Sequence, residues 1–308
     1  MAKNLKILGL DNGFKFTKTS KGVCFCSSIQ KGKDDINEVT QVEIDGQNYI
    51  VGEQIGRYIS DADKLKDEEN KEILKVCTLT AIGLSYPGET FIDVSLVVGV
   101  PVGYYSNQKE EFKTMIEDLS GKILINEIGF EQTININKVL VYPQSAGIIF
   151  KHASKLKNQT SLVIDIGGGT WDISQFDGLK LIKKSTYQQG MLVLDSKIAQ
   201  WVNSNYYTTF DATEIYDLMQ KGFFTAAGEK IGVKIFEHII EDHVFKVITN
   251  IKHDFDVNSV DNVFIIGGGA EVLKDYLDRY INNIEIDSNP QFTNASCFEL
   301  MGQMKWSK

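Results

Sequence analysis

The feature that most constrains the fold of this chain is a short pattern that occurs once in each half. In the first half an apolar run at residues 7–10 ends in Asp11, Asn12 and Gly13, and in the second half residues 162–164 lead into Asp165 and the glycines at 167–169. Each pattern is followed by a further β-rich run, so each predicts a strand, a tight turn and a returning strand. The repeated unit indicates two similarly built halves.

Two turns of this kind can bind a polyphosphate. Glycine lets backbone N–H groups come close to phosphate oxygens, and magnesium, which keeps several of its waters, is commonly held by carboxylates through those waters. Two turns that face each other would hold a nucleoside triphosphate and its magnesium ion from opposite sides of a cleft. The sequence therefore predicts that Asp11 and Asp165 hold magnesium through water and take part in catalysis.

Composition narrows the class of protein. The chain has 308 residues, of which 43% are hydrophobic, enough to bury substantial cores in two lobes. Its 41 acidic and 32 basic residues give a formal net charge of −9, which disfavours direct binding to nucleic acid or to an anionic membrane. No apolar run reaches the length of about 18 residues that a membrane span needs. We therefore expect a cytoplasmic protein whose cysteines are reduced thiols.

Apolar periodicity predicts strands that alternate with helices, which is typical of an α/β protein. The expected strands are residues 6–10, 14–19, 22–28, 42–44, 49–51, 91–98, 128–136, 139–141, 161–165, 170–176, 179–187 and 263–266, and the expected helices are 71–84, 108–119, 192–202, 212–220, 229–251 and 271–280. The dipeptide Asp45-Gly46 predicts a hairpin turn. Pro143 is expected in the first turn of a helix.

Five landmarks, in this order, resemble those of the actin-like ATPase superfamily, which includes actin, bacterial actin homologues, the heat-shock chaperone ATPase and sugar kinases. The landmarks are a first phosphate turn at Asp11-Asn12-Gly13, a first connection between lobes at Pro143-Gln144-Ser145-Ala146-Gly147, a second phosphate turn at Asp165-Ile166-Gly167-Gly168-Gly169-Thr170, an adenosine motif at Ile265-Ile266-Gly267-Gly268-Gly269-Ala270, and a second connection at Asn294-Ala295 followed by Gly302. Each glycine cluster is common in α/β proteins, whereas the ordered set is specific.

The resemblance covers essentially the whole chain and implies an α/β, actin-like (ribonuclease H-like) fold with two lobes. Each lobe is expected to be a mixed sheet with flanking helices, and the nucleotide cleft lies between the lobes. The predicted lobes are residues 1–157 and 158–308, with the last helix crossing back to the first lobe. Within the superfamily the compact chain looks most like the ParM (StbA) group of filament-forming proteins that segregate plasmids.

The resemblance also assigns roles to residues. Gln144 is expected to orient the attacking water, because a side-chain amide can accept a hydrogen bond from water and donate one elsewhere. Lys18 matches the lysine that contacts phosphate in the family, and we prefer it to Lys15. The full set of expected nucleotide-binding residues is Asn12, Gly13, Lys18, Gly167, Gly168, Gly169, Thr170, Gly190, Gly267, Gly268 and Gly269. Asp195 resembles a chaperone motif, although a helix N-cap accounts for it equally well.

The expected function is a nucleoside triphosphatase, using ATP or GTP with magnesium, whose nucleotide state controls a filament of identical subunits. Phosphoryl transfer to water depends mainly on positioning and charge neutralisation, and a glutamine is no strong base, so hydrolysis should be slow. The resemblance further implies a DNA-binding adaptor of the ParR type. Two alternatives remain open: a small-molecule (sugar-type) kinase on the same fold, and a monomeric, nucleotide-gated, chaperone-like module.

Overall fold

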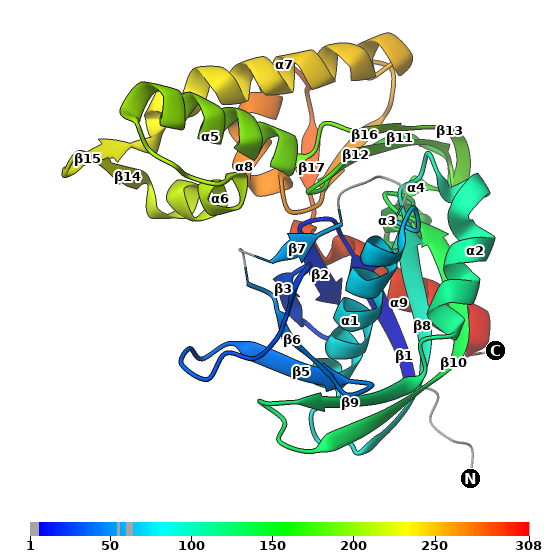
Figure 1. Cartoon of the computed structure of the whole chain (residues 1–308). Coiled ribbons are helices and arrows are strands. Elements are labelled where there is room, and N and C mark those ends of the chain that lie inside the picture. Colours follow the sequence, from blue (N-terminus) through cyan, green and yellow to red (C-terminus); the bar gives the residue numbers. More distant parts are fainter. Residues whose placement is uncertain (1–5, 54–55, 60–63, 308) are drawn as a thin grey trace.

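The computed structural model describes residues 6–53, 56–59 and 64–307, and in this part of the chain two lobes face each other (Figure 1). A ten-stranded sheet forms the first lobe and a five-stranded sheet forms the second. Helices cover both faces of each sheet where the sheets approach the centre of the molecule. The predicted two-lobed α/β architecture is therefore confirmed.

The first sheet is parallel at its centre. Strand β1 (Lys6–Asn12) pairs in parallel with β8 (Phe91–Val100), which pairs in parallel with β10 (Glu131–Pro143). Antiparallel strands extend the sheet on both sides in the order β3-β2-β1-β8-β10-β9-β5-β6-β4-β7. The outer strands are β2 (Phe16–Thr19), β3 (Cys24–Cys26), β4 (Ser28–Lys31), β5 (Thr40–Ile44), β6 (Gln47–Val51), β7 (Arg57–Tyr58) and β9 (Gly121–Ile125).

Alternation along β1 places helices on both faces of this sheet. Leu8 and Leu10 pack into a core with α1 (Glu68–Ser85) and α2 (Tyr105–Glu117). The opposite face meets α9 (Thr293–Trp306), which the chain reaches only at its end. A Cβ on Gly9 would lie 1.9 Å from the carbonyl oxygen of Ala295, so only glycine allows α9 to come this close to β1.

The second sheet has the order β13-β12-β11-β16-β17. Its strands are β11 (Thr160–Ile166), β12 (Trp171–Asp177), β13 (Lys180–Tyr187), β16 (Asn262–Ile266) and β17 (Ile284–Ile286). Ile164 packs towards α5 (Met191–Tyr206), α7 (Glu237–Asp254) and α8 (Ala270–Leu277). Val163 points the other way, into a separate core with α3 (Ile148–Lys151) and α4 (Ala153–Leu156). This strand is therefore apolar on both faces, as a central strand must be.

The predicted helix over residues 229–251 is wrong at its beginning. The chain first forms a hairpin of β14 (Phe223–Ala226) and β15 (Glu229–Gly232), then a 3₁₀ turn, η1 (Val233–Phe236), before α7 begins. Ala227 and Gly228 both have positive φ, 48° and 85°, which gives a tight hairpin turn. Alanine is rare at such a position, so the turn carried no recognisable signal. The hairpin follows α6 (Ala212–Lys221) and projects from the second lobe (Figure 1).

The prediction that Pro143 begins a helix is also wrong, because Pro143 ends β10. The two strands expected at 128–136 and 139–141 are one strand with an irregularity between Ile136 and Lys138. Beyond it Ser145 has a φ of 66°, which prevents a helix from starting before α3. The predicted turn at Asp45-Gly46 is confirmed, with φ values of 53° and 77° between β5 and β6.

The predicted boundary between residues 157 and 158 stays a prediction. Strands β1 to β10 precede it and β11 to β17 follow it, while α9 contacts the first sheet.

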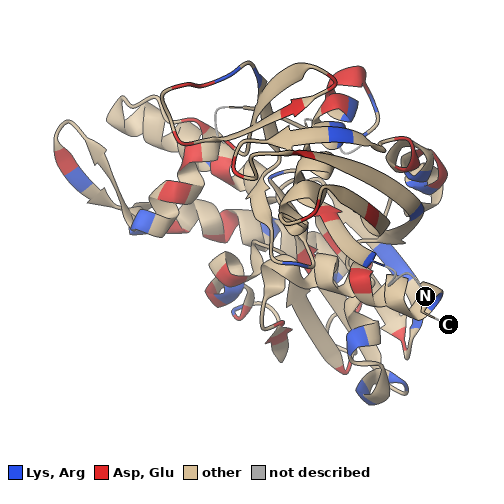
Figure 2. Cartoon of the chain, turned by 90° about the horizontal axis from the view of Figure 1, so that it is seen from below, with Lys and Arg blue, Asp and Glu red and all other residues tan. Residues whose placement is uncertain are grey.

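The described helices include none that is long and apolar enough to cross a membrane. In the described part of the chain, basic and acidic residues are interspersed along the ribbon (Figure 2).

Candidate functional site

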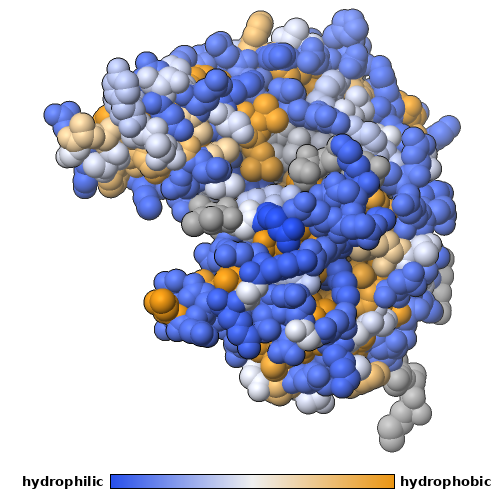
Figure 3. Space-filling model, in the orientation of Figure 1, coloured by the Kyte–Doolittle hydropathy of each residue, from blue (hydrophilic) through white to orange (hydrophobic). Residues whose placement is uncertain are grey.

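A cleft lies between the two lobes. The space-filling view shows that the molecule is hollowed between them (Figure 3). Both predicted phosphate turns and the predicted adenosine motif line the cleft. The lining residues are Asp11, Gly13, Phe14, Lys15, Phe16, Lys18, Gln144, Asp165, Gly167, Gly168, Thr170, Asp172, Met191, Tyr216, Gly267, Gly268, Gly269, Val272, Gln291 and Asn294.

The first turn joins β1 to β2. The N–H group of Gly13 donates a hydrogen bond to the carbonyl oxygen of Phe16 at 3.1 Å, which closes the turn. A Cβ on Gly13 would lie 2.7 Å from that same oxygen, so the tight turn requires glycine. The strand pairing sets Asp11 opposite Lys18 across the turn.

The second turn joins β11 to β12 in the same way. Its closing hydrogen bond runs from the N–H group of Gly167 to the carbonyl oxygen of Thr170 at 2.8 Å. Gly168 and Gly169 touch the first turn directly, because a Cβ on either would lie within 2.6 Å of Lys15 or Phe14. The two predicted turns are thus adjacent in the structure, although they are far apart in the sequence.

The touching turns carry backbone donors without acceptors. None of the described residues accepts a hydrogen bond from the N–H groups of Phe14, Lys15, Gly168 or Gly169. Buried backbone donors are nearly always paired in a complete structure. Successive unpaired N–H groups in glycine turns form anion-binding concavities, so these turns are suited to phosphate oxygens.

Asp11 is held as an anion on the floor of the cleft. Lys18 Nζ lies 3.0 Å from one carboxylate oxygen, and Gln144 Nε2 donates to the other at 2.9 Å. Burial raises the pKa of Asp11, but the charges of Lys18 and Lys64 and the hydrogen bond from Gln144 outweigh it and hold the pKa below its usual range. The structure therefore brings the predicted residues Asp11, Lys18 and Gln144 together.

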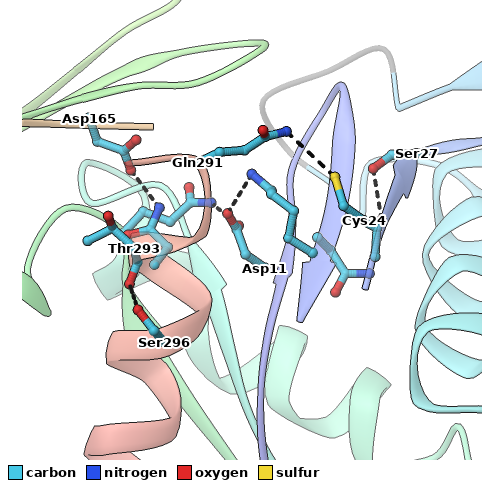
Figure 4. Close-up of polar contacts among 12 residues, drawn as sticks. Asp11, Cys24, Ser27, Asp165, Gln291, Thr293 and Ser296 are labelled. Atoms are coloured by element: carbon cyan, nitrogen blue, oxygen red, sulfur yellow. Dashed lines mark hydrogen bonds and ion pairs between the residues drawn. The ribbon is translucent and has the colours of Figure 1, made fainter. Parts of the chain in front are cut away.

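Asp165 has a different electrostatic environment on the facing side of the cleft (Figure 4). Burial and the negative charge of Asp172 raise the pKa of Asp165 to about 7. Asn294 Nδ2 donates to its carboxylate at 2.7 Å, which opposes this shift, and Asn294 Oδ1 accepts from the N–H of Ser145 at 3.3 Å. Asn294 thus ties the second connection to both the second turn and the first connection.

The predicted adenosine motif begins where β16 ends. Gly267 has a φ of 88°, and a Cβ there would lie 2.4 Å from a carboxylate oxygen of Asp165. Gly269 donates its N–H to the carbonyl oxygen of Ile166 at 3.0 Å, so the motif packs on the second turn. Apolar and aromatic side chains also line the cleft: Phe16, Met191, Tyr216 and Val272.

Besides Gly169, which packs against Phe14 of the first turn, two predicted residues do not line the cleft. Asn12 points away from it, since its Nδ2 donates to Thr78 Oγ1 of α1 at 3.0 Å. Gly190 lies beneath the second turn, where a Cβ would lie 2.4 Å from the carbonyl oxygen of Gly168, and its N–H donates to the carbonyl oxygen of Gly169 at 3.1 Å. Both residues support a turn and do not face the cleft.

Sequence reasoning missed two charged residues at the site. Asp172 is buried on β12 and accepts hydrogen bonds from Thr170 Oγ1 at 2.7 Å and from the N–H of Val102 at 2.9 Å. Asp172 follows Thr170 by two positions, a spacing that places two side chains on one face of an extended chain. This spacing could have identified Asp172 from the sequence. Lys64 donates to the carbonyl oxygen of Asn12 at 2.5 Å, and nothing in its polar surroundings in the sequence predicted burial.

Asp195 and Lys15 have roles that differ from those considered in the sequence. Asp195 is no N-cap, because α5 begins at Met191 with Gly190 as its cap. Asp195 instead forms an ion pair with Lys15 across the cleft, with 2.5 Å between Nζ and the carboxylate. Sequence alone could not pair these residues, since they lie on different lobes.

The cleft is lined by carboxylates, although among the described residues no three acidic side chains meet closely enough to bind a metal ion directly. Three buried carboxylates, those of Asp11, Asp165 and Asp172, face it. Burial raises the pKa values of Asp165 and Asp172, so these carboxylates lack sufficient positive charge beside them. Oxygen ligands of this kind are those that magnesium prefers. The role of Asp11 and Asp165 in holding magnesium through its waters stays a prediction.

Comparisons with known proteins agree with this geometry. A family model described as the N-terminal domain of actin-like proteins matches residues 9–147. A second model, described as the C-terminal domain of archaeal MreB-like actin homologues, matches residues 163–279. Together the two matches include both phosphate turns, Gln144 and the adenosine motif.

Solved structures of actin homologues share the fold over their whole length. A ParM from a 15-stranded filament of Clostridium botulinum is 20% identical, with a TM-score of 0.80, and the alignment covers 98% of this chain and 100% of that one. A non-polymerisable quadruple mutant of pCBH ParM is 24% identical, with a TM-score of 0.81 and the same coverage. An archaeal actin homologue in complex with ADP is 18% identical, with a TM-score of 0.79, covering 97% and 100%. The predicted actin-like fold is confirmed.

Proposed function

Because the chain belongs to the actin-like superfamily, with ParM proteins among its structural neighbours, we propose that it binds and hydrolyses a nucleoside triphosphate between its lobes and uses the nucleotide state to control a filament. The observation that carries this proposal is the contact between the two glycine turns, with Asp11 and Asp165 on facing sides of one cleft. A site that holds phosphate from two lobes couples the bound nucleotide to the angle between them.

The backbone binds the polyphosphate. The unpaired N–H groups of Phe14, Lys15, Gly168 and Gly169 donate to phosphate oxygens, and Lys18 adds positive charge beside Asp11. Magnesium held by Asp11 and Asp165 through its waters neutralises phosphate charge when it is bound. The base lies at the apolar end of the cleft, against the motif at residues 267–269. Either adenine or guanine is compatible with these walls.

Hydrolysis follows from the position of Gln144. Its Nε2 is fixed by donation to Asp11 at 2.9 Å, so its Oε1 is left to accept a hydrogen bond from a water. An amide orients this water but does not deprotonate it strongly, so the rate is low. A slow reaction suits a filament whose nucleotide state acts as a timer.

Assembly of identical subunits is the part of the proposal that the relatives support most directly. One similar structure is described as a 15-stranded ParM filament, and another as a non-polymerisable ParM mutant. We extend filament formation to this chain, with plasmid segregation as its role. The net charge of −9 disfavours direct DNA binding, so a DNA-binding adaptor of the ParR type is the proposed link to DNA.

Light scattering, sedimentation and electron microscopy test this function together. The protein is mixed with magnesium and ATP, GTP, ADP or GDP in parallel. We expect scattering and pelletable filaments with at least one triphosphate, and loss of both signals as phosphate is released. A protein that binds nucleotide and stays monomeric at high concentration would contradict filament formation and favour the chaperone-like module.

The sugar-kinase alternative is tested by the same nucleotide assay with a panel of sugars. Such an enzyme needs a general base beside the acceptor hydroxyl, whereas the residue of the first connection that lines the cleft is Gln144, which is no strong base. We expect no sugar to change the turnover. Strong stimulation by one sugar without filaments would replace the proposed function with a kinase.

A further inference from the structure

Lys15 and Asp195 form a buried ion pair between the two lobes. Lys15 belongs to the first turn, and Asp195 lies in α5 of the second lobe, with 2.5 Å between Nζ and the carboxylate. Their side chains are only 9% and 5% exposed. Neither side chain has a role in the hydrolysis described above, so the pairing of these side chains requires another explanation.

An aromatic contact lies beside the ion pair. Phe16 of β2 meets Tyr216 of α6 edge to face, with ring centroids 5.7 Å apart and an angle of 64° between the planes. The ammonium group of Lys15 also lies 5.0 Å from the centre of the Tyr216 ring. We call Lys15, Phe16, Asp195 and Tyr216 the interlobe cluster. Two of its members come from each lobe.

The interlobe cluster stands at the cleft itself. Lys15, Phe16 and Tyr216 all line the cavity, and Phe16 and Tyr216 are half-buried, so the cluster extends from the interior to the surface. The lobes also meet at the segment after β8, where the N–H of Val102 donates to Asp172. In Figure 1 α6 and α2 lie on different sides of the molecule. The cluster and the segment leading into α2 therefore join the lobes at separate places.

Separating the lobes at the cluster is costly. Burial raises the pKa of Asp195 and Lys15 opposes that shift, so the lysine stabilises the charged carboxylate. The closed cleft holds these two charges as a matched pair, and removal of either partner would leave an uncompensated buried charge. Opening also exposes two aromatic faces. Each of these effects favours the closed cleft.

We propose that the interlobe cluster controls how fast nucleotide leaves the cleft. This inference rests on the proposed function, because it assumes that a nucleotide occupies the cavity. Since members of the cluster line the cavity from both lobes, a bound nucleotide leaves after the Lys15–Asp195 pair and the Phe16–Tyr216 contact have separated. The cluster thereby sets the lifetime of the nucleoside diphosphate state.

Stopped-flow release of a fluorescent nucleoside diphosphate, chased with excess unlabelled nucleotide, tests the proposal. We expect Asp195→Asn and Lys15→Met each to release the diphosphate at least about 10-fold faster than the wild type, since loss of one partner of a buried pair acts mainly on dissociation. Lys15→Arg keeps the charge and should remain within about threefold of the wild type. Arg279→Met removes an exposed ion pair with Glu241 in the same lobe and serves as the control, with release unchanged.

The double variant Lys15→Met/Asp195→Asn separates the cluster from a simple phosphate contact. If the two residues act as a pair, the double variant releases nucleotide about as fast as either single variant. Faster release by Lys15→Met with unchanged release by Asp195→Asn would show that Lys15 acts on the phosphate alone, and would overturn the proposal.

Three further results are interpretable. If Asp195→Asn does not fold, the diphosphate release rates of Lys15→Met and Lys15→Arg are compared instead. Release at the wild-type rate by both variants overturns the proposal. Failure of the wild type to bind any nucleotide would overturn the proposed function and this inference together. Normal binding with unchanged release in both single variants would overturn only the role of the interlobe cluster.

Discussion

Gln144 donates a hydrogen bond from Nε2 to Asp11 at 2.9 Å, which joins the first connection between lobes to the first phosphate turn. The same carboxylate is also bound by Lys18 at 3.0 Å. The residue proposed to orient water is thus held by a residue proposed to hold magnesium. Under the proposed function, a shift of Asp11 would therefore move the residue that orients the attacking water.

Replacing Gln144 separates hydrolysis from binding. We expect Gln144→Ala to slow phosphate release by about 10- to 100-fold, because misplacement of a reacting group costs factors of this size. Nucleotide affinity should change less than threefold, since the backbone turns remain intact. Phosphate release and nucleotide titration are measured side by side, with Gln303→Ala on the exposed face of α9 as control. Equal losses of affinity and rate would show that Gln144 serves binding and not water.

Removing Asp165 should abolish the dependence of hydrolysis on magnesium. Asp165→Ala deletes one of the facing carboxylates and the acceptor of the Asn294 hydrogen bond. We expect phosphate release to fall at least about 100-fold and to stay flat as magnesium is raised. Asp177→Ala, at the exposed end of β12, is the control and should keep the wild-type magnesium response. A variant that regains full rate at high magnesium would mean that Asp165 assists affinity only.

Two adjacent glycines provide a matched pair of variants. Gly267 has a φ of 88° and its Cβ would lie 2.4 Å from Asp165, whereas the nearest atom to a Cβ on Gly268 is Gln291 Cγ at 3.8 Å. Gly267→Ala should lower the free energy of unfolding by about 1–3 kcal/mol, because it adds backbone strain, and should weaken nucleotide binding. Gly268→Ala should be near neutral in urea unfolding. Similar effects of the two changes would refute this packing.

The second lobe should become less stable in acid, because His243 binds a proton more readily in the unfolded than in the folded state. Its Nε2 meets the carbonyl oxygen of Gln189 at 2.9 Å and its Nδ1 meets Lys197 Nζ at 3.1 Å. Burial, followed by the charges of Lys197 and Lys246, lowers the pKa of His243 to about 4. The unfolded histidine has its usual pKa near 6.5 and binds the proton first, so stability is lost as the pH falls from about 6.5 to 4.

Urea unfolding at pH 7 and pH 5 measures this effect. The pKa difference corresponds to a loss of about 2 kcal/mol between these two pH values from His243. In His243→Gln that part of the acid sensitivity should disappear, while His253→Gln, an exposed histidine of the same helix, should behave like the wild type. An unchanged acid sensitivity in His243→Gln would show that the pKa of His243 is the same in the folded and the unfolded state.

Much of the site could be predicted because its residues lie in local patterns. Asp11 and Asp165 each end an apolar strand before a glycine turn, and strand pairing alone then fixes the shape of the turn. The central strand β11 was readable because its residues are apolar on both faces. Local backbone geometry and burial therefore account for the parts that sequence predicted.

The remaining parts depend on contacts between distant segments. Lys15 finds Asp195 only after the lobes have closed, and Lys64 reaches Asn12 from a polar segment that has no periodic pattern. The hairpin at Ala227-Gly228 adopts a turn that its residue types do not favour, so packing of Phe224 into the second core overrides local preference. Such features follow from tertiary structure and leave no short-range signal.

The most direct test of the central claim is a crystal structure of the protein with magnesium and a non-hydrolysable triphosphate analogue. Our account predicts that the phosphates lie between the turns at Gly13 and Gly168, that the ion lies on the side of Asp11 and Asp165, and that the base lies against Gly268. A nucleotide bound on any other surface, with the cleft between the lobes empty, would contradict the account.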